Sequence, residues 1–324
     1  MEITEIMVDM FSANILHLVQ QSTSRLFQFT DPESAGAKGE IKFYDRKGKG
    51  QARRKEGRNE DVIYSNPDWT RRGIACDDYY ESYLEDRLDR LRVIADPDSE
   101  DAKTVAMSLG RQMDEVIIEA AMGDALTGRH GAGSVATVPD SQKICAFDGV
   151  TIDGLGLNVK TLRAVRKKFK QNEAIQKDAK GKGLEKIVFA MASQQSDDLL
   201  GQTEVTSTDY AAVKALVDGE VDTFLGMTFV ELELLSFTDA DISYDPETGA
   251  IDAAGAGTLT SGEGRICLAF TDKRALKSDR KAEIMGRVDE IETKHFAHQI
   301  YGAITFGAVR MEEEQLMLVY CKEL

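Results

Sequence analysis

The chain has 324 residues, a formal net charge of −16, 30% charged residues and 42% hydrophobic residues. This length is enough for one large domain or two ordinary ones, and the composition is that of a globular protein with a heavily charged surface. The negative charge repels nucleic acid over most of the surface, which argues against a protein that wraps DNA directly but not against one that encloses it.

The four cysteines are far apart and form no CxxC pair, so we expect reduced, mostly buried thiols. The N-terminal segment lacks the basic start and continuous apolar core of a signal peptide. No run of about 18 apolar residues is present, and we therefore expect no membrane span. These features predict a protein of the cytoplasm, or of a particle that is assembled there.

Residues 1–29 carry apolar side chains at helical spacing and predict an amphipathic arm. Two interpretations fit this pattern equally well: a helix that packs on its own domain, and an arm that lies on another subunit. In the second interpretation the contact residues include large apolar side chains near the start of the chain, namely Ile3, Met7, Met10 and Phe11.

Residues 30–69 predict a long hairpin with a charged tip. Two β-like pieces, EIKFY and DVIYS, flank a polar stretch that contains glycine. Residues 38–58 carry nine lysines and arginines against three acids, a net charge of +6 within a chain of −16. Such a segment has little apolar surface with which to pack on its own domain.

Three interpretations of this basic stretch remain open. A solvated loop is the simplest of them. A nucleic-acid patch would need interleaved aromatic side chains to stack bases, and these are missing. An arm that reaches the acidic surface of a neighbouring subunit would use the charge asymmetry of the chain. In that case the expected contact residues are the cations at and near the tip: Lys47, Lys49, Arg53, Arg54, Lys55 and Arg58.

A long helix is the clearest element of the sequence. Asp96–Pro97 interrupts the preceding segment, and Asp98 or Ser99 can cap a helix that runs over about 99–126. Its apolar residues recur at i, i+3, i+4 and i+7, which defines one buried face. About 28 residues in a helix span roughly 40 Å, so this element predicts a spine for its domain.

The rest of the chain mixes helices and strands without a regular alternation. Asn158 is expected to cap a basic helix over 158–171, LEKIVFAM reads as a buried strand before a short helix, and DYAAVKALV as a helix. TFVELELLSF and RICLAF read as strands, DKRALKSD as a turn or short helix, and the segment after it as strands around short bends. The order predicts an α+β fold.

No catalytic, cofactor-binding or metal site is expected. The sequence holds no GxSxG, HExxH or Walker motif, and the glycines of 127–135 follow a helix, whereas a phosphate loop joins a strand to a helix. Asp239, Asp241 and Asp245 lack calcium-loop spacing and its closing glutamate, so a solvated loop is favoured. The two histidines of HFAH have no third ligand in sight.

Taken in order, these pieces resemble the major capsid proteins of tailed bacteriophages with the HK-ninety-seven-like fold, and within them a family common in short-tailed phages. The resemblance is carried by the basic hairpin GEIKFYDRKGKGQARRKEGRNEDVIYS, by RRGIACDDYYESYLEDRLDRLRVIADPDS leading into AKTVAMSLGRQMDEVIIEAAMGDA, and by the ending YGAITFGAVRMEEEQLMLVYC. A GAVR-M-E element is typical of the closing strands of that family. The resemblance covers nearly the whole chain.

The resemblance implies a division into an N-terminal arm (1–29), an extended loop (30–69), a peripheral domain with the spine helix (70–150), an axial domain (151–284) and C-terminal strands (285–324) that return to the peripheral domain. It also implies that "LMLVYC" completes a sheet, with MEEEQ as a polar interruption. The implied function is structural and not enzymatic: copies assemble as pentamers and hexamers into an icosahedral head around double-stranded DNA, without sequence-specific binding.

The resemblance further implies a virion location, assembly in the host cytoplasm and no membrane contact. The partners it implies are a separate scaffolding protein, since the chain begins directly at the arm, a portal protein and a cement protein. Two other functions remain open at this point. One is an encapsulin-like cellular compartment, which shares the fold but encloses enzymes, and the other is an unrecognised α+β enzyme.

Overall fold

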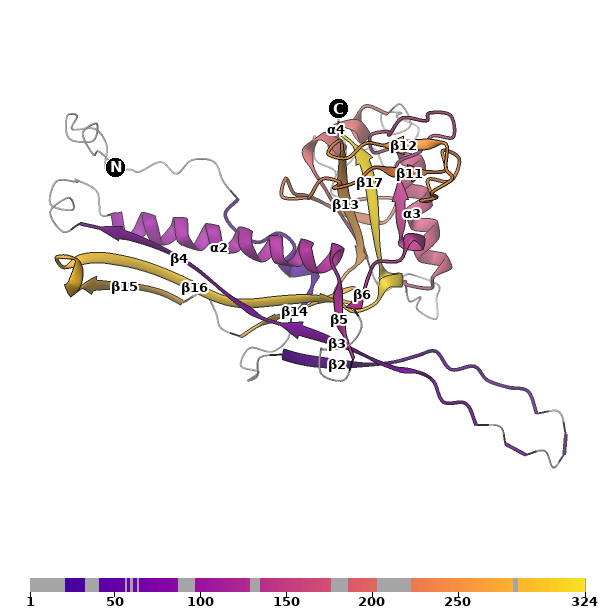
Figure 1. Ribbon diagram of the computed structural model, residues 1–324, viewed down its shortest axis with the longest axis horizontal. Coiled ribbons are helices and arrows are strands. Elements are labelled where there is room, and N and C mark those ends of the chain that lie inside the picture. The colour runs from indigo at the N-terminus through magenta and orange to yellow at the C-terminus, as the bar shows by residue number, and fades with distance from the viewer. Residues whose placement is uncertain are drawn as a thin grey trace.

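The computed structural model describes residues 21–32, 41–55, 57–58, 61–62, 64–86, 97–128, 135–175, 186–202, 223–281 and 285–323. Helix α2 (Pro97–Met122) lies along a long sheet, and this elongated unit meets a compact unit built around a six-stranded sheet (Figure 1). A hairpin projects from the junction of the two units, away from α2 (Figure 1). None of the described helices is long and apolar enough to cross a membrane.

Helix α2 begins two residues before the predicted start and ends four residues before the predicted end. The helix stops at Met122 because the next residues form other hydrogen bonds: the Gly123 N–H donates to the Glu119 carbonyl at 2.7 Å, and Ala125–Thr127 (β5) enters a sheet. Most of the predicted apolar face is buried, but Ala102 and Ala106, in the N-terminal part of the helix, are exposed. Its buried residues are Val105, Leu109, Met113, Ile117, Ile118 and Ala121.

The long sheet has β16 (Ala297–Arg310) as its central strand, and β16 pairs with three others. Gly302 of β16 lies directly under α2, where an added Cβ would stand 2.3 Å from Val105 Cγ1, so the helix approaches closely only because this residue has no side chain. The other strands of this sheet are β1 (Asp31–Pro32), β4 (Asp77–Glu85), β14 (Leu276–Arg280) and β15 (Met285–Ile291).

The six-stranded sheet is the core of the compact unit, and all five residues of its strand β8 (Ile187–Met191) are buried. Helix α3 (Val159–Gln171) begins at Asn158, whose side chain accepts a hydrogen bond from the Thr161 N–H as predicted (2.7 Å), and α4 (Ser193–Leu200) follows β8. The strand order is β7 (Lys143–Cys145), β17 (Leu316–Lys322), β13 (Gly264–Thr271), β8 (Ile187–Met191), β10 (Met227–Glu231) and β9 (Thr223–Phe224).

Two smaller sheets and four short 3-10 turns complete the described structure. The hairpin sheet has the order β2 (Ile41–Lys47), β3 (Trp69–Ala75), β5 and β6 (Val135–Ala136). The other sheet pairs β11 (Ile242–Tyr244) with β12 (Gly257–Leu259). The 3-10 turns are η1 (Phe27–Phe29), η2 (Asp140–Gln142), η4 (Glu292–Lys294) and η5 (Glu313–Gln315).

Three predicted elements differ in the structure, the simplest being TFVELELLSF, which was expected to be a strand throughout but is a strand only to Glu231, the end of β10. The other two differ in position or type. The second strand of the hairpin is Trp69–Ala75, whereas the described residues of 61–65 are not in a strand. The segment DKRALKSD, expected as a turn or short helix, contains strand β14, which is held between β1 and β16. In both cases pairing with a distant strand decides the conformation, and local propensity does not contain that information. The helix predicted over 209–217 lies outside the described residues.

The predicted domain boundaries do not follow the sheets. Strand β14 belongs to the predicted axial segment 151–284 but pairs within the long sheet. Strand β17 belongs to the C-terminal segment 285–324, which was expected to return to the peripheral domain, but it pairs with β13 and β7 in the six-stranded sheet. The chain therefore passes between the two units more often than the linear division implies.

Candidate functional site

The end of the predicted arm is held to the spine helix by one buried carboxylate. Asp114 of α2 is completely buried. It accepts hydrogen bonds from the backbone N–H groups of Arg25 (3.0 Å) and Leu26 (3.1 Å), from Ser24 Oγ (2.5 Å) and from the Gln21 side chain. A carboxylate that satisfies several donors fixes the chain direction at that point. Residues 21–26 therefore pack on their own subunit.

The predicted arm contacts Ile3, Met7, Met10 and Phe11 lie outside the described residues. Their contact with another subunit stays a prediction.

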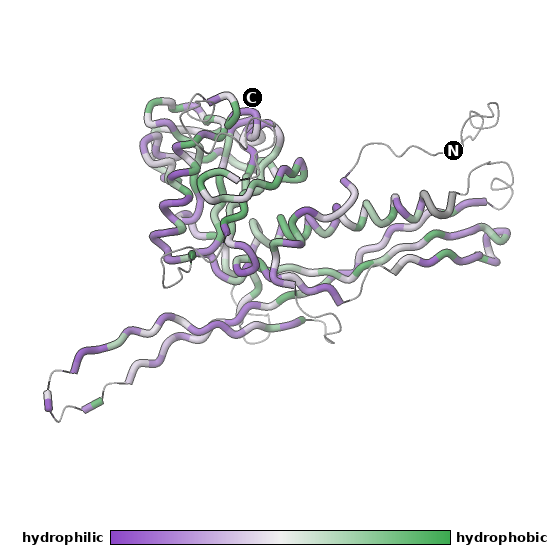
Figure 2. The backbone as a smooth tube through the Cα atoms, turned by 180° about the vertical axis from the view of Figure 1, so that it is seen from behind, coloured by the Kyte–Doolittle hydropathy of each residue, from purple (hydrophilic) through white to green (hydrophobic). Residues whose placement is uncertain are grey.

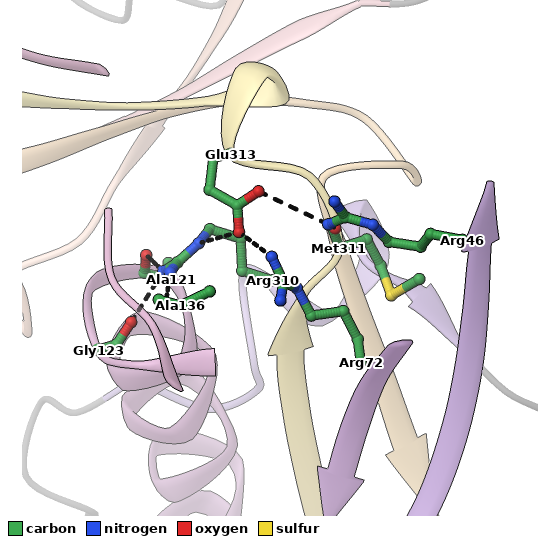
Figure 3. Close-up of polar contacts among 8 residues, drawn as sticks. All are labelled: Arg46, Arg72, Ala121, Gly123, Ala136, Arg310, Met311 and Glu313. Carbon is green, nitrogen blue, oxygen red and sulfur yellow. Dashed lines mark hydrogen bonds and ion pairs between the residues drawn. The ribbon is translucent and has the colours of Figure 1, made fainter. Parts of the chain in front are cut away.

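The base of the hairpin is organised by Arg310, a completely buried arginine at the end of β16. Its guanidinium donates to the carbonyls of Ala121 (2.8 Å), Gly123 (2.9 Å) and Ala136 (2.7 Å), as Figure 3 shows. Two of these carbonyls lie at the C-terminal end of α2, where the helix leaves acceptors unpaired and carries partial negative charge. Arg310 thus joins the spine helix, β6 and the long sheet at one point.

Glu313 stands at the centre of three arginines (Figure 3). Its carboxylate pairs with Arg310 at 3.8 Å, with Arg46 of β2 at 3.6 Å and with Arg72 of β3, which donates a hydrogen bond to it. Arg46 also donates to the Met311 carbonyl. Both strands of the hairpin are therefore tied to the turn between β16 and β17.

Burial lowers the pKa of both Arg72 and Arg310 from the ordinary value, and the Glu313 carboxylate opposes that effect. A guanidinium starts from so high a pKa that both side chains stay charged. Removing the carboxylate would leave these two buried cations without their counter-ion.

Beyond this base the hairpin has a different character. The described residues between β2 and β3 are exposed, apart from Pro67, and Figure 2 shows that this part of the chain is mainly hydrophilic. Three large apolar residues are nevertheless open to solvent: Val62 is 74% exposed, Tyr64 86% and Trp69 69%. A charged loop that also presents apolar side chains is typical of a surface that is covered in an assembly.

The six predicted loop cations divide into two groups. Lys47 lies over the Trp69 ring (5.3 Å to the centroid) and Lys49 pairs with Glu314 (3.2 Å), so both contact their own subunit near the base. Arg53, Arg54, Lys55 and Arg58 are exposed, and Lys55 contacts only the Arg58 carbonyl within this group, at 3.2 Å.

Sequence reasoning missed the base cluster of Arg46, Arg72, Arg310 and Glu313. One signal was present: an arginine between two apolar strands, with an acid three positions later, is an unusual pattern unless the charges are paired. The cluster fixes the direction in which the hairpin loop projects relative to α2.

The acidic loop residues considered as calcium ligands contact their own backbone. Across the described ranges, no group of three histidine, cysteine, aspartate or glutamate side chains lies close enough to hold an ion. Asp241 and Asp245 accept hydrogen bonds from their own loops, from the N–H groups of Ser261 (2.8 Å) and Glu247 (2.9 Å).

Comparison with solved structures shows the fold. The capsid of Ralstonia phage GP4 matches with a TM-score of 0.70 at 10% sequence identity, covering 98% of this chain and 95% of that chain. The cyanophage Pam1 capsid asymmetric unit matches with a TM-score of 0.67 at 13% identity, covering 97% and 96%. The capsid of the Helicobacter pylori bacteriophage KHP30 gives 0.65 at 10% identity, covering 97% and 95%. The predicted α+β, HK-ninety-seven-like fold class is confirmed.

None of the curated proteins matches the chain. The family model described as phage capsid protein matches residues 3–323, nearly the whole sequence. The chain therefore belongs to the phage capsid protein family.

Proposed function

We propose that copies of this chain form pentamers and hexamers that close into an icosahedral head around double-stranded DNA, and that the extended hairpin of each copy lies on its neighbour. Membership of the capsid family makes the protein a structural component of the virion shell. What the proposal adds is the kind of capsomer, the enclosed genome and the residues that join the subunits.

The observation that carries the proposal is the contrast within the hairpin. Its base is held to α2 and the long sheet by partly buried ion pairs and by the hydrogen bonds of the buried Arg310, whereas Arg53, Arg54 and Lys55 are exposed to solvent. A rigid base and an exposed basic tip direct positive charge away from a subunit whose net charge is −16. The acidic surface of another copy is a complementary target.

Weak contacts of this kind suit a closed shell. A contact with a millimolar dissociation constant contributes about −4 kcal/mol, so a wrongly placed subunit can dissociate. Closure then adds many such contacts per subunit, which makes the finished particle stable. The net negative charge of the chain also favours enclosing DNA without holding it through phosphate contacts.

Further partners follow from the family resemblance. We propose a separate scaffolding protein and a portal protein during assembly in the host cytoplasm, and a cement protein on the finished particle. Their support is the likeness to phage capsids, since the described residues identify no surface specific to any of these partners.

The test is electron microscopy of the protein expressed alone and with a candidate scaffolding protein. Wild-type protein should give closed particles or sheets of six-membered rings. The variant Arg53→Glu/Arg54→Glu/Lys55→Glu should keep the wild-type circular dichroism and melting temperature but lose most particles, because the tip has almost no contacts within its own subunit.

The matched control replaces the same three residues with glutamine. The glutamine variant, which only removes charge, should assemble better than the glutamate variant, which reverses it. The loss of particles by the glutamate variant should increase as salt is lowered, because like charges then repel over a longer distance. Normal particle yield from the glutamate variant would contradict the hairpin contact. A wild-type protein that stays monomeric in both expression conditions would contradict shell assembly itself.

A further inference from the structure

A groove of about 730 Å³ lies in the angle between the C-terminal half of α2 and the compact unit. Its floor is apolar and includes side chains from both units, such as Ile118 of α2 and Leu318 of β17. Its rim is acidic. The carboxylates that line it are Glu115, Glu119, Asp124 and Asp239, and all four residues are exposed.

In the described part of the chain, Glu115, Glu119 and Asp239 have no cationic partner, and Asp124 has only the electrostatic attraction of the buried Arg310. None of them has a side-chain hydrogen bond or an ion pair in the described part of the chain. The one lysine among the lining residues, Lys143, already pairs with Asp140 at 2.8 Å. The groove therefore presents mostly uncompensated negative charge around an apolar floor, which suits a partner that brings cations.

Helix α3 presents the opposite charge. One of its faces is buried against the six-stranded sheet through Leu162, Val165 and Phe169. On the other face, Arg163, Arg166, Lys167 and Lys170 line a hollow of about 460 Å³ beside Leu225.

Within the described part of the chain, none of these four cations has an acidic or hydrogen-bonding partner. Their spacing of three and four residues places them as neighbours on the helix surface, where like charges repel one another. The basic face is therefore less stable alone than it would be against an anionic partner.

The two surfaces lie on opposite sides of the compact unit. In Figure 1, α2 and the long sheet extend to the left of the six-stranded sheet, whereas α3 lies on its right. The hairpin projects towards the side of α3 as well (Figure 1). Copies placed side by side in one orientation would bring the α3 side of one subunit towards the groove of the next.

We propose that the basic face of α3 docks against the acidic groove of the neighbouring copy in the capsomer. The contact is heterologous, joining two different surfaces of the same chain, and such contacts close into rings when the rotation between copies permits it. The inference rests on the proposed assembly into capsomers. It assigns to each subunit a second contact besides the hairpin, formed by Arg163, Lys167 and their neighbours with Glu115 and Glu119.

Packaged nucleic acid is the other anion that α3 could meet. The acidic groove favours a second copy, because a nucleic-acid contact would explain the free cations of α3 but leave the four rim carboxylates without partners.

The experiment is a charge exchange in the full-length protein, under the conditions in which the wild type assembles. Arg163→Glu/Lys167→Glu should raise the protein concentration at which particles appear by about tenfold, as should Glu115→Lys/Glu119→Lys, because each variant places like charges opposite one another. Combining the four substitutions should restore assembly to within about twofold of wild type, since the pairs are formed again with reversed sign.

The single variant Lys167→Glu should also assemble less well than the wild type, and Lys168→Glu is its matched control. Both residues lie on α3 and undergo the same charge change, but only Lys167 lines the hollow. The control should assemble as the wild type does, and the melting temperature of every variant should remain within a few degrees, because the substituted groups have no described partner to lose.

Three results would overturn the proposal. The first is wild-type assembly by Arg163→Glu/Lys167→Glu. The second is wild-type assembly by that variant together with less co-purifying nucleic acid, which would show that the cations bind nucleic acid. The third is a variant with all four substitutions that assembles no better than either double variant. A wild-type protein that forms no particles would instead contradict the proposed function.

Discussion

Strand β17 and the loop of the hairpin differ in how much contact they make within their own subunit. Six of the seven residues of β17 are buried, and the strand pairs with β13 along its whole length. The described loop residues between β2 and β3 are almost all exposed and have few contacts beyond the base. The first region is determined by folding of the single subunit, whereas the second has features that only another molecule would explain.

The boundary between these two regions is the cluster around Glu313. On the side of the two sheets, side chains are closely packed and their polar groups are hydrogen-bonded. On the side of the hairpin loop, charged and apolar side chains are exposed and make few contacts with the described part of the subunit. Substitutions on the two sides should therefore separate stability from assembly.

The largest effect on stability is expected in the six-stranded sheet. Phe270→Ala should lower the free energy of unfolding by about 3–5 kcal/mol, because Phe270 is fully buried and its loss leaves a cavity. Tyr64→Ala, in the hairpin, removes another aromatic ring but one that is 86% exposed, and it should change stability by less than about 0.5 kcal/mol. Urea unfolding monitored by fluorescence measures both, and equal losses would remove the distinction between the regions.

A smaller loss of unfolding free energy is expected at the cluster around Glu313. Glu313→Gln should destabilise the subunit by about 2–3 kcal/mol, because it leaves the buried cations Arg72 and Arg310 without their carboxylate. Hydrogen exchange should also increase at β2 and β3, where the hairpin is tied to the base. Unchanged exchange in those strands would show that Glu313 does not hold the hairpin.

Alkaline pH should destabilise the compact unit, and near pH 10 the loss of unfolding free energy should be smaller than that expected for Glu313→Gln. Burial raises the pKa of Cys145, ordinarily 9.0, and of Tyr320, ordinarily 10.0, to about 12 in both cases. A raised folded-state pKa gives stability that is complete below the unfolded value and is lost as pH rises towards the folded value.

The loss should therefore begin above about pH 9 and be on the order of 1 kcal/mol by about pH 10. Urea unfolding across this range measures it. Tyr320→Phe should show a shallower decline above the ordinary tyrosine pKa, and an identical slope in the variant would exclude a contribution from Tyr320.

The smallest effect is expected for an ion pair at the surface of the hairpin. Lys49 and Glu314 lie 3.2 Å apart, but their side chains are 81% and 56% exposed. Glu314→Gln should leave the free energy of unfolding nearly unchanged, because water screens exposed pairs. It is also the matched control for Glu313→Gln, one residue away, and a comparable loss in both variants would argue against burial as the cause.

The elements that sequence reasoning predicted well are those whose signal is local. The spacing of Val105, Leu109, Met113 and Ile117 identified α2, and Asn158 marked the start of α3. The assignment of strands to sheets was not accessible in this way. Strand β14 contains Lys277, Asp279 and Arg280, a composition that favours a turn, and only its position between β1 and β16 makes it a strand.

The contact surface was predicted in part for the same reason. A charge excess along 38–58 is visible in a linear sequence, and the exposed cations of the tip follow from it. The meeting of Arg46, Arg72 and Arg310 at one carboxylate joins residues more than 200 positions apart, and no local pattern records such an approach.

Strands β16 and β17 couple the stability of the two units. Residues 297–322 supply an inner strand to the long sheet and another to the six-stranded sheet, with Arg310 and Glu313 between them. Because loss of this one segment would open both sheets, the two units are expected to unfold together and not one after the other. Subunits with one sheet open and its strand edges unpaired should therefore be rare, which limits wrong pairing between copies at high concentration.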